Sequence, residues 1–94
     1  MYMLHGLLGF KEEFEQHGQV IADGTGHVVT AFDARNHGSS SHTQRISYPL
    51  MAHDLANHME KHNVKEAILV AHSMGAGSAM CLALQQVIFL HCLI

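Results

Sequence analysis

Short apolar runs alternate with longer amphipathic stretches along this chain, and that alternation restricts the fold more than any other feature. The apolar runs cover residues 2–4, 27–35 and 65–73, and a stretch with helical spacing follows each of them. Repeated strand-helix-strand units need right-handed crossovers, which place the strands side by side in one parallel sheet. The sequence therefore predicts an α/β fold in which a parallel sheet of three buried strands has helices on both faces.

The expected helices cover residues 10–22, 49–63 and 74–86. The DGTG segment ends the first, and a proline suits the first turn of the second. Side chains expected to face the sheet are Phe14, Val20 and Ile21 in the first helix and Leu50, Met51, Leu55 and Met59 in the second. Met3, Met51, Met59 and Met80 are expected to fill the core, as are the thiols of Cys81 and Cys92.

Composition excludes several classes of partner. The chain has 94 residues, 48% of them hydrophobic, and a formal net charge of -3, which fits one small domain. Lysine and arginine are scattered, so the sequence predicts no nucleic-acid partner and no polybasic membrane contact. The longest apolar run, residues 87–94, is far shorter than the roughly 20 residues of a spanning helix, so no transmembrane segment is expected.

Each predicted strand ends in an unusual loop, and function collects at this edge of a parallel sheet. In AHSMG, residues 71–75, the small flanking residues let a strand turn sharply into a helix and hold Ser73 exposed at the turn. A serine nucleophile needs a base and donors for the developing oxyanion. The backbone N–H groups of Met74, at the helix start, and of Leu7, in the HGLLG loop, are the candidate donors.

The loops HGLLG, DARNHGSS and AHSMG, with YPLMAHDL in the second helix, follow in the order typical of one family. On these four blocks the chain resembles the α/β-hydrolase superfamily from about Leu4 to Gln85. The resemblance is closest to the branch of the alpha/beta-hydrolase domain-containing 11 subfamily and bacterial esterases. It implies a central sheet in which the first strand lies between the other two, with Ser73 as nucleophile and Leu7 and Met74 as oxyanion donors.

The resemblance also implies acyl-ester or acylglycerol substrates, no cofactor or metal, and a mitochondrial location, as in animal members. The family's catalytic acid and histidine correspond to nothing here, since residues 74–94 contain no Asp or Glu. Residues 1–86 therefore resemble the N-terminal half of a hydrolase domain, and residues 87–94 form a divergent apolar tail. We interpret the chain as a clipped gene model or splice product, and expect it to be inactive alone.

Two alternatives stay open. A non-enzymatic fragment of this fold would bind lipid or a protein partner, and an acyltransferase or thioesterase would use the same serine turn.

Two groups of polar residues suggest other chemistry, but both are expected to be structural. Asp33, Arg35, Asn36 and His37 resemble a charge relay but are expected to form a structural turn. His58 and His62, with Asp54 one turn earlier, suggest zinc, but no third ligand is evident and packing histidines are expected.

The remaining histidines near the predicted loops receive structural roles. His5 and His72 are expected to shape the backbone of the first and third loops rather than to move protons. His91 is the only histidine after Ser73, and nothing in the sequence places it against the hydroxyl.

Overall fold

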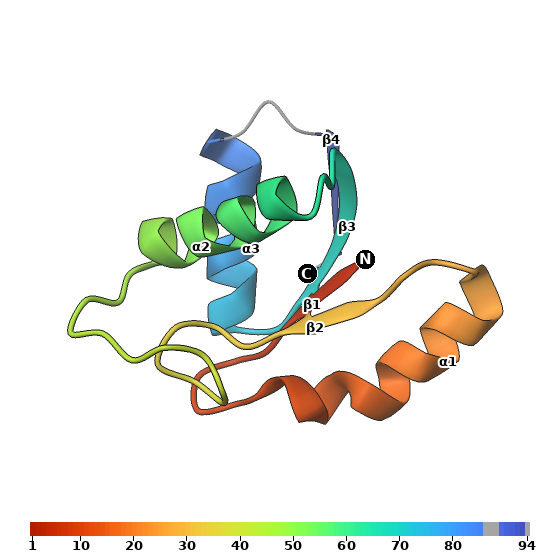
Figure 1. Cartoon of the computed structure of the whole chain (residues 1–94), viewed down its shortest axis with the longest axis horizontal. Coiled ribbons are helices and arrows are strands. Elements are labelled where there is room, and N and C mark those ends of the chain that lie inside the picture. Colours follow the sequence, from red (N-terminus) through yellow and green to blue (C-terminus); the bar gives the residue numbers. More distant parts are fainter. Residues whose placement is uncertain (86–88, 94) are drawn as a thin grey trace.

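The computed structural model describes residues 1–85 together with the backbone of residues 89–93, and it has the α/β architecture expected from the sequence. Figure 1 shows the strands as one sheet with helices on both sides. The elements are β1 (Tyr2–Leu4), the 3-10 helix η1 (Lys11–Phe14), α1 (Glu15–Thr25), β2 (Thr30–Phe32), α2 (Tyr48–Lys61), β3 (Glu66–Ala71), α3 (Met74–Gln85) and β4 (Phe89–Leu93).

The sheet is parallel throughout, with strand order β2-β1-β3-β4. Tyr2 of β1 pairs with Thr30 on one side and Leu69 on the other, so the prediction that the first strand lies between the next two is confirmed. The strand β4 was not predicted, because its segment was interpreted as a divergent tail. It pairs with β3 in the register Glu66 to Phe89 through Val70 to Leu93. The side chains of His91 and Cys92 lie outside the described residues.

The main hydrophobic core lies between the sheet and the pair α2 and α3. Alternate residues of β3 point into it, as the period of a strand requires. Its centre is dry, since Leu55, Leu69 and Leu82 are each at most 1% exposed. The cluster contains Tyr2, Leu4, Ala52, Leu55, Met59, Ala67, Leu69, Ala71, Ala76, Ala79 and Leu82, with Cys81 packed against it.

In the described part of the chain, α1 lies over the opposite face of the sheet (Figure 1). Met3 points to this side, and its sulfur would lie 3.5 Å from a Cβ added to Gly18 of α1. Gly18 thus lets the helix approach the strand closely. The side chains of Ile68 and Val70, on this face of β3, are only half-buried.

Local signals in the sequence explain where the helices begin and end. The Ser47 side chain accepts a hydrogen bond of 3.3 Å from the Leu50 N–H at the start of α2, where Pro49 follows. Asn63 has a φ of 56° directly after that helix. The helix α1 continues to Thr25 and stops at Gly26, whose φ of 73° marks a left-handed cap. Within the described residues, no helix is long and apolar enough to cross a membrane.

Several expectations about burial were wrong. The second strand spans three residues rather than nine and is half-buried, because within the described sheet only β1 pairs with it. Val20 is 70% exposed and Met80 is 47% exposed, so neither fills the core. In α3 nearly every residue is apolar or small, and such a sequence does not mark which side faces solvent.

Candidate functional site

The three predicted loops meet at the carboxyl edge of the sheet, and two glycines allow the first and the third to come close. A Cβ on Gly6 would lie 2.9 Å from Nδ1 of His72 and 3.4 Å from Cβ of Ser73. A Cβ on Gly75 would lie 2.6 Å from the carbonyl oxygen of Leu4. The distances of 2.9 Å and 2.6 Å are too short for an ordinary side chain, so the start of α3 lies directly against the end of β1.

Ser73 occupies the sharp turn between β3 and α3. Its φ of 53° lies in the left-handed region, which costs a non-glycine residue about 1–2 kcal/mol. The turn is closed by a 3.0 Å hydrogen bond from the Gly75 N–H to the His72 carbonyl, and the His72 N–H donates to the Leu4 carbonyl at 3.0 Å. The serine is exposed at this turn, and within the described residues its hydroxyl has neither a histidine nor a carboxylate partner.

The candidate donor Leu7 lies in a second tight turn, directly after Gly6. The Gly9 N–H donates to the Gly6 carbonyl at 3.0 Å, which places Leu7 and Leu8 at the centre of the turn, and Leu8 has a φ of 62°. Leu7 is 68% exposed and Leu8 is 86% exposed. In the described part of the chain, the N–H groups of Leu7 and Met74 meet no hydrogen-bond acceptor.

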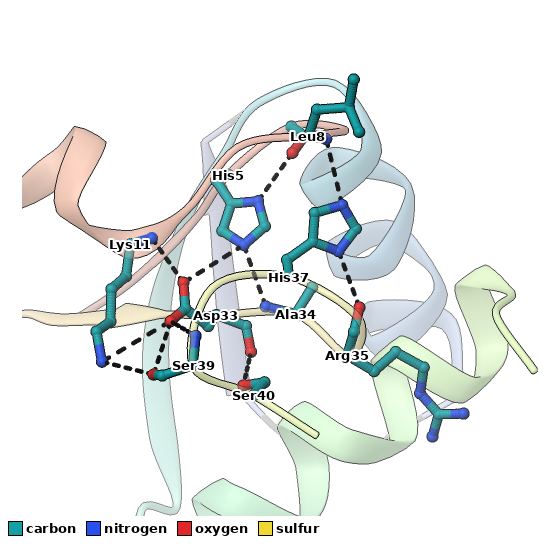
Figure 2. A network of polar contacts seen from close by, with 10 residues as sticks. His5, Leu8, Lys11, Asp33, Ala34, Arg35, His37, Ser39 and Ser40 are labelled. Carbon is teal, nitrogen blue, oxygen red and sulfur yellow. Dashed lines mark hydrogen bonds and ion pairs between the residues drawn. The ribbon is translucent and has the colours of Figure 1, made fainter. Parts of the chain in front are cut away.

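A buried polar network ties the first loop to the second (Figure 2). His5, only 1% exposed, lies with Nδ1 at 2.8 Å from the Gly6 carbonyl, while its Nε2 accepts from the Ala34 N–H at 3.1 Å. Since a carbonyl oxygen only accepts, the ring proton is on Nδ1. The prediction that His5 shapes the backbone is confirmed.

The carboxylate of Asp33 is the centre of this network. It accepts the Lys11 N–H at 2.7 Å, the Ser39 N–H at 3.0 Å and the Ser39 hydroxyl at 3.1 Å, with the Lys11 ammonium 3.8 Å away. Burial raises the pKa of Asp33, but the hydrogen bonds from Ser39 and Lys11 and the lysine charge outweigh it, and the net pKa is lowered. Gly38, with a φ of 51°, leaves room for the carboxylate where any side chain would collide with it.

The second loop is also fastened to α2. Arg35 donates to Asp54 through Nε at 2.7 Å and through a terminal nitrogen at 2.8 Å, and it also bonds the Arg45 carbonyl at 3.0 Å. The backbone of residues 35–40 forms successive turns. The prediction that Asp33 and Arg35 belong to a structural turn is therefore confirmed.

The predicted packing role of the second-helix histidines is half right. His58 is half-buried, its Nδ1 lies 3.0 Å from the Tyr2 hydroxyl, and its ring meets Phe32 edge to face. His62 is exposed, although its ring lies tilted against that of His58, with centroids 4.3 Å apart. His72 is exposed too, and its backbone forms the serine turn.

Sequence reasoning missed the partners that fix these loops. Lys11 and Ser39 both bind Asp33, and Ser40 donates to the Asp33 carbonyl at 2.6 Å. An aspartate followed by a glycine and serines is a signal for such a loop. No local pattern indicated Lys11, because it comes from a segment 22 residues earlier in the chain.

A hollow of about 570 Å³ opens beside the Leu7 turn. Its apolar lining comes from both loops and includes Leu7, Leu8, Phe10 and Ile46. A volume of this size suits a small organic ligand.

Comparison with known proteins agrees with this arrangement. The chain is 38% identical over 86 residues to the sn-1-specific diacylglycerol lipase ABHD11 of Xenopus tropicalis, covering 92% of this chain and 27% of that protein. It is 34% identical over 82 residues to ethanol acetyltransferase 1 of Cyberlindnera fabianii, covering 87% of this chain and 24% of that protein. The chain thus spans about a quarter of the length of these relatives.

The fold itself also matches a solved structure. A marine microorganism esterase superposes with a TM-score of 0.84 at 28% identity, covering 95% of this chain and 33% of the esterase. The family model described as alpha/beta hydrolase fold matches residues 1–94. The whole of this chain therefore belongs to the alpha/beta hydrolase fold family.

Proposed function

We propose that this chain carries the nucleophile and the oxyanion donors of a serine hydrolase that cleaves carboxylic esters. The observation that carries the proposal is Ser73, an exposed serine held at a φ of 53° between β3 and α3. A serine strained in this way at the top of an α/β sheet is the geometry that presents a nucleophile. The close approach of Gly6 to His72 and Ser73 supports Leu7, the next residue, as the second donor.

The reaction assigns one role to each group. The Ser73 hydroxyl attacks the ester carbonyl while its proton passes to a base, and the carbonyl oxygen becomes an oxyanion that accepts the N–H groups of Leu7 and Met74. Collapse expels the alcohol, which takes the proton, and leaves an acyl-serine. Water then attacks the acyl group, releases the acid and restores the serine. No step needs a cofactor.

An acylglycerol-type lipid is the substrate class that we favour. The apolar side chains on one part of the hollow beside Leu7 suit an acyl chain, and Glu12 is the one carboxylate among its described lining residues. The Xenopus relative is named a diacylglycerol lipase, which agrees with a lipid ester.

We propose that the base and its acid are not among the described side chains, where the Ser73 hydroxyl has neither a histidine nor a carboxylate partner. No Asp or Glu follows Ser73 in the chain. A triad enzyme that loses its base and acid keeps only about 10³ to 10⁴ over the uncatalysed rate. We therefore infer that the chain alone is nearly inactive.

The decisive experiment is a graft, in which residues 1–85 replace the matching segment of the Xenopus relative. We expect hydrolysis of a short-chain ester by the graft and a loss of about 10⁴-fold or more in Ser73→Ala, since the nucleophile is removed. Ser41→Ala, at an exposed position in the second loop, is the matched control and keeps full activity. Turnover that survives Ser73→Ala in a folded graft overturns the role of Ser73, and a folded graft without turnover leaves a non-enzymatic binding role.

Acyl transfer to an alcohol is the second candidate, favoured by the similarity to ethanol acetyltransferase 1. Both reactions share the acyl-serine and differ only in whether water or an alcohol attacks it. Adding ethanol to the graft assay and measuring ethyl ester against free acid separates them.

The mitochondrial location implied by the family resemblance is also part of the proposal. Microscopy of the longer protein carrying a fluorescent tag tests it.

A further inference from the structure

The Leu7–Leu8 turn holds a non-glycine residue in an unfavourable conformation, so something must stabilise it. Leu8 has a φ of 62°, and its side chain is 86% exposed, so packing supplies little. The Leu8 N–H donates to Nε2 of His37 at 3.2 Å, across 29 residues of sequence. Figure 2 shows the His37 ring between this N–H and the carbonyl of Arg35.

The hydrogen bonds of His37 determine where its proton lies. Nδ1 is 2.8 Å from the Arg35 carbonyl oxygen, which only accepts, so Nδ1 carries the proton. Nε2 must then offer a lone pair to Leu8. His37 is 8% exposed, and its ring lies beside the His5 ring, with centroids 5.1 Å apart. Arg35 is itself fixed by its two bonds to Asp54, so the ring has a rigid support.

We propose that His37 is a positioning residue for the proposed reaction, because its neutral ring holds the Leu7–Leu8 turn with the Leu7 N–H at the serine site. The inference rests on the proposed function. His37 touches no reacting atom in this mechanism and acts through the Leu8 backbone. Without the ring, the strained turn relaxes and the Leu7 donor leaves its place, although the serine turn stays intact.

Two substitutions separate the two contacts of the ring. The amide of an asparagine reaches the position of Nδ1, whereas that of a glutamine reaches the position of Nε2. His37→Asn thus retains the contact with Arg35 and loses the one with Leu8, while His37→Gln retains an acceptor for the Leu8 N–H. We expect His37→Asn to lower the kcat of the graft about 10- to 100-fold, less than the loss of a whole oxyanion donor, with KM nearly unchanged. His37→Gln restores most of the lost rate.

A third variant tests the strain directly. Glycine adopts a positive φ without cost, so with Leu8→Gly the turn no longer needs the hydrogen bond to His37. We expect the double variant Leu8→Gly, His37→Asn to be faster than His37→Asn alone, which is a coupling between the two sites. The double variant also tests the role of His37 if His37→Asn folds poorly, because relieving the strain at Leu8 then restores both folding and rate.

Hydrogen exchange on the 94-residue chain reads the same contact without turnover. The Leu8 amide is expected to exchange about tenfold faster in His37→Asn than in the parent or in His37→Gln. Equal protection in all three, or equal kcat in grafts that still depend on Ser73, overturns the role of His37 and leaves the proposed function standing. Activity that does not depend on Ser73 overturns the proposed function instead.

Discussion

The carboxyl edge of the sheet and the face covered by α1 are stabilised in different ways. At the edge, the buried polar side chains of His5, Asp33 and His37 all have hydrogen-bond partners within the chain. On the α1 side of the molecule, Val20 of the helix is 70% exposed, and Val28, in the loop after it, is 82% exposed. Hydrogen bonds between buried polar groups thus fix the loops of the site, whereas apolar side chains on the α1 side of the molecule remain in contact with water.

The largest expected difference in stability between the two regions comes from substitutions of glycine. In the graft, Gly75→Ala puts a Cβ within 2.6 Å of the Leu4 carbonyl and 2.8 Å of the His5 carbonyl, and neither backbone atom yields easily. We expect a loss of about 3 kcal/mol in the free energy of unfolding, the upper end of overpacking costs. The matched control is Gly24→Ala in α1, where nothing lies within 4 Å, and a gain of up to about 1 kcal/mol is expected. Equal urea midpoints for the two variants would contradict the comparison.

The next largest loss of stability is expected in the polar network around Asp33. Asp33→Asn removes the charge that Lys11 and Ser39 stabilise, and we expect a loss of about 2 kcal/mol, as for hydrogen bonds to charged groups. The exposed control Asp23→Asn in α1 changes the free energy of unfolding by less than about 0.5 kcal/mol.

The same carboxylate predicts a pH dependence in acid. Because the pKa of Asp33 is lowered by folding, its contribution is complete above the unfolded value of 3.8 and is lost as pH falls through the folded pKa. Urea midpoints between pH 5 and pH 2 should fall more steeply for the parent graft than for Asp33→Asn. Parallel curves would show that Asp33 is not the group responsible.

Part of this architecture was predictable from the sequence. The α2 stripe follows from a pattern in neighbouring residues, whereas the strand order was implied only by the family resemblance. Met51, Leu55 and Met59 are buried as predicted, since a helix with one clear apolar face has one way to pack. The serine turn was predictable because small residues surround it. Met80 and the Lys11 contact were not, because exposure within an all-apolar helix and pairing between distant loops depend on tertiary packing.

The α1 face predicts a change in association rather than in stability. The edge of β2 and exposed apolar side chains such as Val28 favour self-association of the 94-residue chain. We expect Val28→Lys to shift the chain toward smaller species in size-exclusion chromatography, while its unfolding free energy changes by less than about 0.5 kcal/mol. A parent chain that elutes as a sharp monomer would contradict this prediction.

The smallest effect is expected on the side of the core away from the site, at His58. Burial, followed by the charges of His62 and Lys61, lowers the pKa of this imidazole. As pH falls below the unfolded value of 6.5, the unfolded chain takes up the proton first, so stability is complete above that value and declines toward the folded pKa. His58→Phe keeps an aromatic ring beside Tyr2 and Phe32 and removes the titrating group. The drop in urea midpoint from pH 7.5 to pH 5.5 should therefore be smaller in His58→Phe than in the parent graft. In the exposed α1 control His17→Gln, the drop should equal that of the parent graft. An equal drop in all three would mean that the packing of His58 does not depend on its neutral form.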